Sequence, residues 1–79
     1  MYKVAFEDEA QKEFLKLEKK AQELIKDKIL DLKNGIFSND KQLKGKYRKR
    51  AGNYRIIYLK ENNLLVITIV RVAHRKEVY

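Results

Sequence analysis

The segment from Leu64 to Val70 is an almost continuous apolar run that is rich in β-branched side chains. It is far too short to span a bilayer, and its composition is typical of a β-strand covered on both faces. The rest of this 79-residue chain has to supply that cover. A chain of this length supports one hydrophobic core, so we expect a single domain spanning residues 1–79.

Two amphipathic helices are predicted ahead of this strand. Residues 2–6 alternate in hydrophobicity and predict a short strand, after which Asp8 and Gln11 have the spacing of a capping box and predict a helix start. A turn at Lys19-Lys20 leads to a second helix that ends at Asn34-Gly35, where glycine suits the position after a helix. The apolar residues at helical spacing are Ala10, Phe14 and Leu17, with Leu15 broadening the stripe, followed by Ala21, Leu24, Ile25, Ile29 and Leu32. These helices should form a hairpin with one apolar side.

The second half of the chain reads mainly as strands. Residues 36–42 carry polar and turn-forming side chains and predict a loop. Residues 46–51 and 54–60 predict two strands joined at Gly52-Asn53, a pair that tolerates positive φ in a tight hairpin. Residues 76–79 are a candidate for a short final edge strand. The predicted order is β-α-α-β-β-β, with this optional last β, in an α+β fold whose helical hairpin packs on a small, mainly antiparallel sheet.

A two-residue turn at Gly52-Asn53 also predicts which side chains share a face. It pairs Arg50 with Arg55, and paired side chains lie on the same side of a sheet. Extending this register pairs Arg48 with Ile57 and Lys46 with Leu59. The predicted basic patch contains Lys46, Arg48, Arg50 and Arg55, and the opposite face carries Tyr47, Ala51, Tyr54, Ile56 and Tyr58. Two directly opposed arginines destabilise a sheet, but they make a good phosphate clamp.

The charge balance points to an anionic partner. Nineteen Lys and Arg residues against eleven Asp and Glu residues give a net charge of +8, which favours RNA, DNA, an acidic protein or an anionic membrane surface. The cations gather from Lys44 onward, whereas the lysines of the helices and the acidic Glu9, Glu13 and Glu18 are interpreted as a solvent-exposed face. The first seven residues lack the apolar core of a signal peptide, so we expect a cytoplasmic protein that has no contact with the membrane.

Several kinds of chemistry are excluded by composition. The absence of cysteine rules out a disulfide scaffold, a thiolate metal site and a cysteine nucleophile. The single histidine leaves only carboxylates to complete a metal site, and these show no ligand spacing. We therefore expect neither a metal nor a cofactor.

The basic segment carries a set of side chains suited to cleaving RNA by internal transfer. That reaction needs a base for the 2′-OH, an acid for the 5′-oxygen and cations for the phosphorane. His74 titrates nearest neutrality, the arginines at 48, 50 and 55 match phosphate oxygens, and Tyr79 offers a ring on which an unstacked base can lie. One histidine near arginines also recurs in RNA-binding domains that have no catalytic activity.

Two motifs resemble a known family. The segment Gly52-Asn53-Tyr54-Arg55-Ile56-Ile57-Tyr58 and the ending Val72-Ala73-His74-Arg75-Lys76-Glu77-Val78-Tyr79, together with Leu43-Lys44-Gly45, are similar to the RelE/ParE superfamily of toxins from toxin–antitoxin systems. The resemblance covers essentially the whole chain. Its terminal segment, of the form V-x-H-R-x-x-V-Y, looks like the RelE branch.

The resemblance implies an endoribonuclease that enters the ribosomal A site and cleaves mRNA without a metal. It implies phosphate binding by Arg55, basic residues at Arg48 and Arg50, a cationic group at His74 or Arg75 and a stacking or proton-transferring phenol at Tyr79. Arginine is a poor general base, so Arg48 and Arg50 supply charge better than they accept a proton. The basic residues expected to contact RNA around this site are Lys44, Lys46, Lys49 and Arg75.

The implied partners are a RelB-like cognate antitoxin that wraps the toxin, the 70S ribosome and mRNA, with no direct reading of DNA by this chain. Two alternatives share the fold. One is a ParE-like toxin that poisons DNA gyrase by binding, and the other is a basic domain that binds RNA or the ribosome without catalysis.

Overall fold

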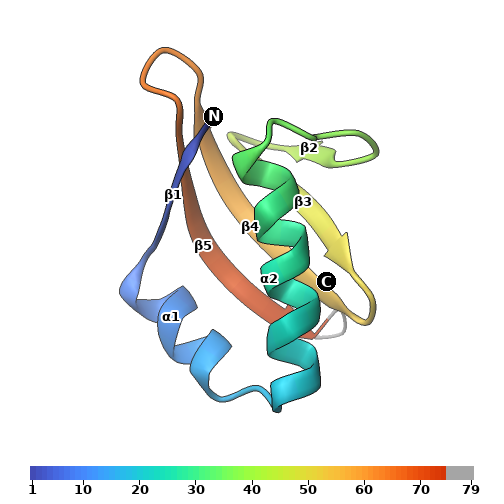
Figure 1. Ribbon diagram of the computed structural model, residues 1–79. Coiled ribbons are helices and arrows are strands. Elements are labelled where there is room, and N and C mark those ends of the chain that lie inside the picture. Colours follow the sequence, from blue (N-terminus) through green and yellow to red (C-terminus); the bar gives the residue numbers. More distant parts are fainter. Residues whose placement is uncertain (75–79) are drawn as a thin grey trace.

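Five strands and two helices make up residues 1–74, the part of the chain that the computed structural model describes (Figure 1). The elements in chain order are β1 (Lys3–Phe6), α1 (Asp8–Leu15), α2 (Lys19–Lys33), β2 (Lys41–Leu43), β3 (Lys46–Ala51), β4 (Tyr54–Glu61) and β5 (Val66–His74). The sheet order is β1-β5-β4-β3-β2, with β1 parallel to β5 and the other pairs antiparallel. The predicted α+β fold is confirmed. The candidate strand at 76–79 lies outside the described residues.

Strand β5 lies inside the sheet, between β1 and β4. Ile67 and Ile69 are fully buried and Val72 is almost so, as expected for the apolar run. The predicted bounds were wrong at both ends, because the strand starts at Val66 and continues to His74. The two leucines before it are exposed and belong to the turn after β4, where Leu65 has a φ of 54°.

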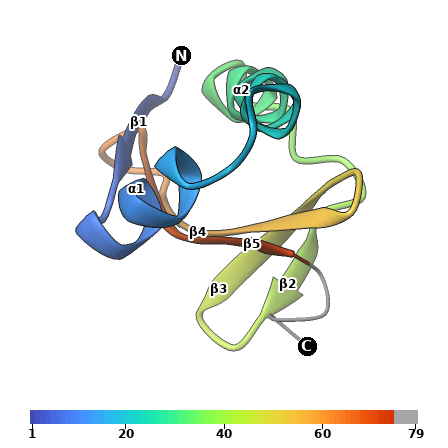
Figure 2. The ribbon, with the colours of Figure 1, turned by 90° about the horizontal axis from the view of Figure 1, so that it is seen from below.

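Both helices cover the same face of the sheet (Figures 1 and 2). Ala10, Ile25 and Leu32 are fully buried against the sheet, as the helical spacing predicted. The predicted C-terminus of α2 is confirmed. Gly35 follows the helix with a φ of 74°, its N–H donates to the Leu32 carbonyl oxygen, and the Ile36 N–H donates to the Asp31 carbonyl oxygen. The capping box was wrong: Glu7 is the N-cap of α1 and makes no side-chain capping bond.

The carboxylate of Glu13 closes an open edge of the sheet. Strand β1 ends at Phe6, which is paired with Ile69 of β5. Beyond Ile69, β5 therefore continues without β1 beside it. There Glu13 Oε1 accepts from the Val72 N–H at 2.8 Å, while Oε2 accepts from Arg71 Nε at 2.8 Å. The interpretation of Glu13 as part of a solvent-exposed face was therefore wrong, because an unpaired strand N–H attracts an acceptor.

The segment predicted as a loop contains a missed edge strand. β2 pairs with β3 through Lys41 and Arg48, Gln42 and Tyr47, and Leu43 and Lys46. Three residues, of which only Leu43 is apolar, carry no strand pattern, and main-chain pairing with β3 forms this strand instead. The pairing places Lys41 beside Arg48 on one face of the sheet.

The β3–β4 hairpin has the predicted register at its turn. Arg50 pairs with Arg55 and Arg48 with Ile57, as predicted, but the ladder between β3 and β4 ends at Tyr47 and Tyr58 and does not include the predicted pair of Lys46 with Leu59. The opposite face is as predicted: Ala51, Ile56 and Tyr58 are fully buried, and Tyr47 and Tyr54 pack against them.

Gly52 is the position of the hairpin turn least able to accept a side chain. Its φ is 62°, and a Cβ there would lie 2.7 Å from Leu24 Cδ2. Gly45, in the turn before β3, has a similar φ of 72° but nothing within 4 Å of the same position. The two glycines therefore share the backbone requirement and differ in packing.

We predict that Gly52→Ala lowers the free energy of unfolding by about 2–4 kcal/mol, because alanine adds overpacking to an unfavourable backbone conformation. The matched control Gly45→Ala should lose only about 1 kcal/mol, from the backbone alone. Urea denaturation of the purified chain measures both. Equal losses in the two variants would contradict this account of the hairpin turn.

Candidate functional site

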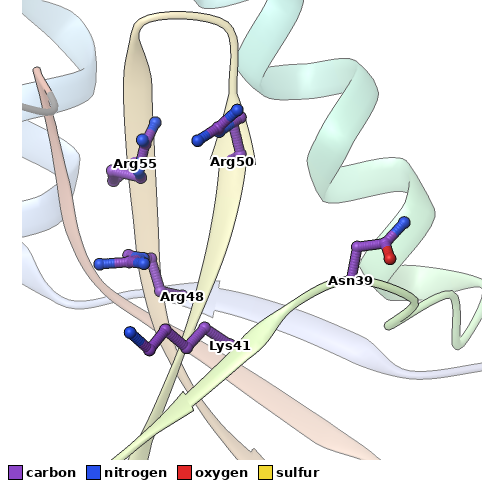
Figure 3. A pocket seen from close by; sticks show the side chains of 5 residues that line it. All are labelled: Asn39, Lys41, Arg48, Arg50 and Arg55. Carbon is purple, nitrogen blue, oxygen red and sulfur yellow. The ribbon is translucent and has the colours of Figure 1, made fainter.

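A cationic pocket of about 270 Å³ lies on the sheet around the β3–β4 hairpin (Figure 3). Its lining residues are Asn39, Lys41, Arg48, Arg50 and Arg55. Lys41 is paired with Arg48 across β2 and β3, and Arg50 with Arg55 across β3 and β4. Paired side chains share a face, so three strands bring four positive charges to one place. None of these lining residues is acidic, and the pocket is therefore suited to an anion with several oxygens.

Arg55 is the most buried of the three arginines. The residue is only 8% exposed, and its Nη1 donates to the Tyr54 carbonyl oxygen at 3.2 Å. Arg50, directly opposite, is exposed. A planar guanidinium fixed at the base of a pocket loses little freedom when it binds phosphate. The pair thus combines one preorganised donor with one that can adjust to a ligand.

A buried network supports the pocket from the other side of β3. The Asp40 carboxylate accepts from Lys49 Nζ at 2.9 Å and from the Tyr58 hydroxyl at 2.5 Å. The Lys49 and Asp40 side chains are 6% and 4% exposed. Burial, the hydrogen bond to Asp40 and its negative charge all raise the pKa of Tyr58 above its usual value, so this phenol remains a neutral donor.

This network excludes Lys49 from the cationic pocket. Lys49 was predicted to contact RNA, but its side chain is buried with Asp40 and lies on the opposite face from Arg48 and Arg50. Asp40 stands between Asn39 and Lys41 in the chain, and both of these line the pocket. The buried carboxylate therefore anchors the segment that brings two residues to the site.

His74 lies away from the cationic cluster. It is paired with Tyr54, and the two ring centroids are 5.6 Å apart in an edge-to-face arrangement. Tyr54 precedes Arg55, so by strand alternation His74 faces the other side of the sheet from that arginine. The histidine nevertheless follows Ala73, the residue paired with Arg55, and it is absent from the pocket lining.

The other predicted site residues fall into two groups. Lys44 and Lys46 are exposed at and after the β2–β3 turn, and they do not line the pocket. Arg75 and Tyr79 lie outside the described residues. Asn39 and Lys41 were missed because their segment was predicted as a loop. The only available signal was an asparagine in a turn-forming stretch, a residue that tolerates positive φ.

The described residues give no sign of a metal centre or a membrane segment. Within residues 1–74, no three His, Asp or Glu side chains gather closely enough to hold a metal ion. None of the helices in the described part of the chain is long and apolar enough to cross a membrane.

We predict that Asp40→Ala lowers the free energy of unfolding by about 3–5 kcal/mol, because it leaves Lys49 buried without its carboxylate partner. Adding Lys49→Met should recover most of this loss, since removing both charges of a buried pair is often neutral. Asp27→Ala, at an exposed position of α2, is the control. Urea denaturation measures all three, and a loss below about 0.5 kcal/mol in Asp40→Ala would show that the pair is unimportant.

The fold and the pocket define a small α+β protein with a concentrated cationic surface on its sheet. The chain matches a family model described as the ParE toxin of type II toxin–antitoxin systems over residues 4–79. It therefore belongs to this family, within the RelE/ParE toxin superfamily, and is a toxin of the type II class. A comparison with curated protein sequences found no match.

Solved structures of toxins share this fold. The RelB–RelE antitoxin–toxin complex from Methanococcus jannaschii matches with 28% identity and a TM-score of 0.75, covering 96% of this chain and 95% of the other. The RelBE2 complex from Mycobacterium tuberculosis matches with 26% identity, a TM-score of 0.69 and coverage of 94% and 91%. The intact Escherichia coli RelBE complex has 24% identity, a TM-score of 0.78 and coverage of 94% and 96%.

Proposed function

We propose that this toxin is a ribosome-dependent endoribonuclease that cleaves mRNA in the A site. The supporting observation is the cationic pocket, in which four basic side chains and no described acidic one surround a space of about 270 Å³. In the proposed reaction the ribose 2′-OH attacks the adjacent phosphorus and the bond to the 5′-oxygen breaks. The products are a 2′,3′-cyclic phosphate and a free 5′-hydroxyl.

The arginines supply electrostatic stabilisation in this proposal. Negative charge grows on the non-bridging oxygens as the phosphorane forms, and guanidinium donors placed in advance stabilise that charge. Arg55 is the buried donor, and Arg50 on the paired strand is a second donor to the same phosphate. Arg48 and Lys41 add positive charge along the same face. Lys44 and Lys46 extend the basic surface along the RNA.

Proton transfer is assigned to the end of β5 and the residues after it. We propose His74 as the general acid or base, with Arg75 supporting the charge of the leaving group and Tyr79 stacking on a base or transferring a proton. His74 follows Ala73, the partner of Arg55, but its side chain faces the other side of the sheet, so this role requires the RNA to pass around the end of β5. Arginine remains a poor candidate for the 2′-OH base.

We predict that Arg55→Ala lowers the rate of mRNA cleavage about 100-fold or more, since removing one donor to a developing oxyanion has an effect of that order. Arg55→Lys keeps the charge but loses the guanidinium fork, and it should recover only part of the activity. Lys12→Ala, at an exposed position of α1, is the matched charge control and should act like the wild type.

The measurement is a reconstituted translation reaction in which mRNA 3′ ends are mapped with the purified chain present, beside the same RNA without ribosomes. Cuts confined to the A-site codon support the proposal. Absence of cuts in both samples would refute the nuclease, and cuts that persist in both Arg55→Ala and His74→Ala would refute the assigned site.

The name of the matching family favours one second candidate. A toxin that binds DNA gyrase without catalysis of its own would also need a basic surface for a polyanionic complex, and the position of His74 against Tyr54 is compatible with a non-catalytic role. Accumulation of cleaved DNA and an SOS response on induction, with intact mRNA, would identify this activity.

We further propose that a cognate antitoxin covers an apolar groove between the helices and β1. The groove is lined by Phe6, Phe14, Ile29 and Leu30 and is rimmed by Lys26 and Lys33, with Asp27 beside them. Leu30 is 56% exposed. Apolar side chains with a mainly basic rim fit one face of an acidic amphipathic helix. The solved complexes of similar toxins with RelB-type antitoxins support this partner.

We predict that Leu30→Glu weakens capture of the antitoxin encoded beside this toxin by about tenfold or more, because it places a charge in the apolar contact. Leu64→Glu, at a leucine that is 66% exposed in the β4–β5 turn, is the matched control and should leave affinity unchanged. Titration of the labelled antitoxin measures both. Equal affinities for the two variants would place the antitoxin elsewhere.

A further inference from the structure

A second pocket, of about 410 Å³, adjoins the cationic one at an open edge of the sheet. Strand β2 pairs with β3 only along Lys46–Arg48, so among the described residues the last part of β3 has β4 on one side and no strand on the other. The second pocket lies there, between α2, the segment before β2 and the β3–β4 turn. Asn39 and Arg50 line both pockets. A ligand bound in one pocket can therefore continue into the other.

The two pockets differ in the chemistry that they offer. The lining of the cationic pocket has no acidic residue, whereas the second is lined by Asp31 and Asp40 as well as by basic residues, Ser38 and the apolar Ile36. The Asp40 carboxylate is already held by Lys49 and Tyr58, so Asp31 is the carboxylate of this lining that can accept a hydrogen bond from an amino group. Mixed donors and acceptors beside an apolar side chain suit a nucleobase that has left its stack.

Asn39 holds an unusual backbone conformation at the junction. Its φ is 67°, and Asn39 and Leu65 are the only non-glycine residues with positive φ among those described. The next residue holds this conformation in place. The Asp40 side chain belongs to the buried network with Lys49 and Tyr58, and the Asp40 N–H donates to the Phe37 carbonyl oxygen at 3.1 Å. The side chain of Asn39 thus projects from a rigid support.

The direction of this side chain separates it from the phosphate-binding group. Figure 3 shows Lys41, Arg48 and Arg55 gathered on one side, while Asn39 stands apart from them with its amide pointing away. A carboxamide carries both donors and an acceptor, which lets it pair with a base edge that presents the complementary pattern, as adenine does. It contributes no charge to the phosphate.

We propose that Asn39 is a specificity-determining residue that reads one base of single-stranded RNA next to the phosphate held by the arginines. This inference rests on the proposed ribonuclease activity and deepens it, because it assigns base selection to the second pocket and charge stabilisation to the first. A preference for adenine over uracil is expected, since the Asp31 carboxylate of the second pocket can accept a hydrogen bond from an amino group.

The test uses Asn39→Gly, which removes the amide but keeps a residue that adopts positive φ freely. Asn39→Asp is the second variant, because it keeps the shape and the tolerance of positive φ but loses the donors. Asn63→Gly and Asn63→Asp, at an exposed asparagine in the β4–β5 turn, are the matched controls. Urea denaturation checks that each variant remains folded.

The first readout is the distribution of A-site cuts over codons. The wild type should prefer one base at one codon position by about fivefold or more, the lower end of discrimination by an amide. Asn39→Gly should reduce this preference to about twofold or less, and the Asn63 variants should keep the wild-type pattern. An unchanged preference in both Asn39 variants, or a slower reaction with the same preference, would overturn the inference and leave the nuclease standing.

The second readout does not need catalysis. Fluorescence anisotropy at low salt measures binding of four labelled 2′-O-methyl trinucleotides, each of a single base, to the wild type and to Asn39→Gly. Equal affinities of the wild type for all four would overturn the inference, and a preference that Asn39→Gly abolishes would support it. If the wild type cuts no mRNA, the proposed nuclease fails and this binding result alone decides the role of Asn39.

Discussion

The buried carboxylate of Asp40 is the interaction on which the outer half of this structure depends. It joins the segment after α2 to β3 through Lys49 and to β4 through Tyr58. A buried charge is tolerated only when its partners are close and well oriented, so this contact allows few positions for the chain on either side of it. Asn39, the start of β2 and the pocket lining follow from that restriction.

Successive side chains of a strand point to opposite faces of the sheet, and in the β3–β4 hairpin this alternation separates the arginines from the aromatic and most of the apolar side chains. The tyrosines, Ala51 and Ile56 take one face, where the hydrophobic core covers them, and the arginines take the other together with Ile57. The result concentrates like charges, which destabilises the free protein. A bound polyanion relieves that repulsion, and for this reason a surface that is poor for stability is good for binding phosphate.

Local patterns predicted much of this architecture because they report on short-range physics. The two helices follow from apolar spacing, the end of α2 from Gly35, and the Arg50–Arg55 pairing from a two-residue turn. The errors occurred where a distant residue decided the outcome. β2 has no strand pattern of its own, Glu13 is held by the edge of β5, and Lys49 is buried by a carboxylate nine positions earlier.

By itself, the sequence determined the class of fold, the family resemblance and the basic face of the hairpin, since all three depend on residues close together in the chain. Only the tertiary structure decided which cations share a pocket, because Lys41 reaches Arg48 through strand pairing and Lys49 is withdrawn by Asp40. It also placed His74 against Tyr54 and left Asn39 between two pockets. Most of the apolar run at Leu64–Val70 became part of β5. The length of this strand was set by the neighbouring strands and by the turn at Leu65, whose backbone conformation no hydrophobic pattern encodes.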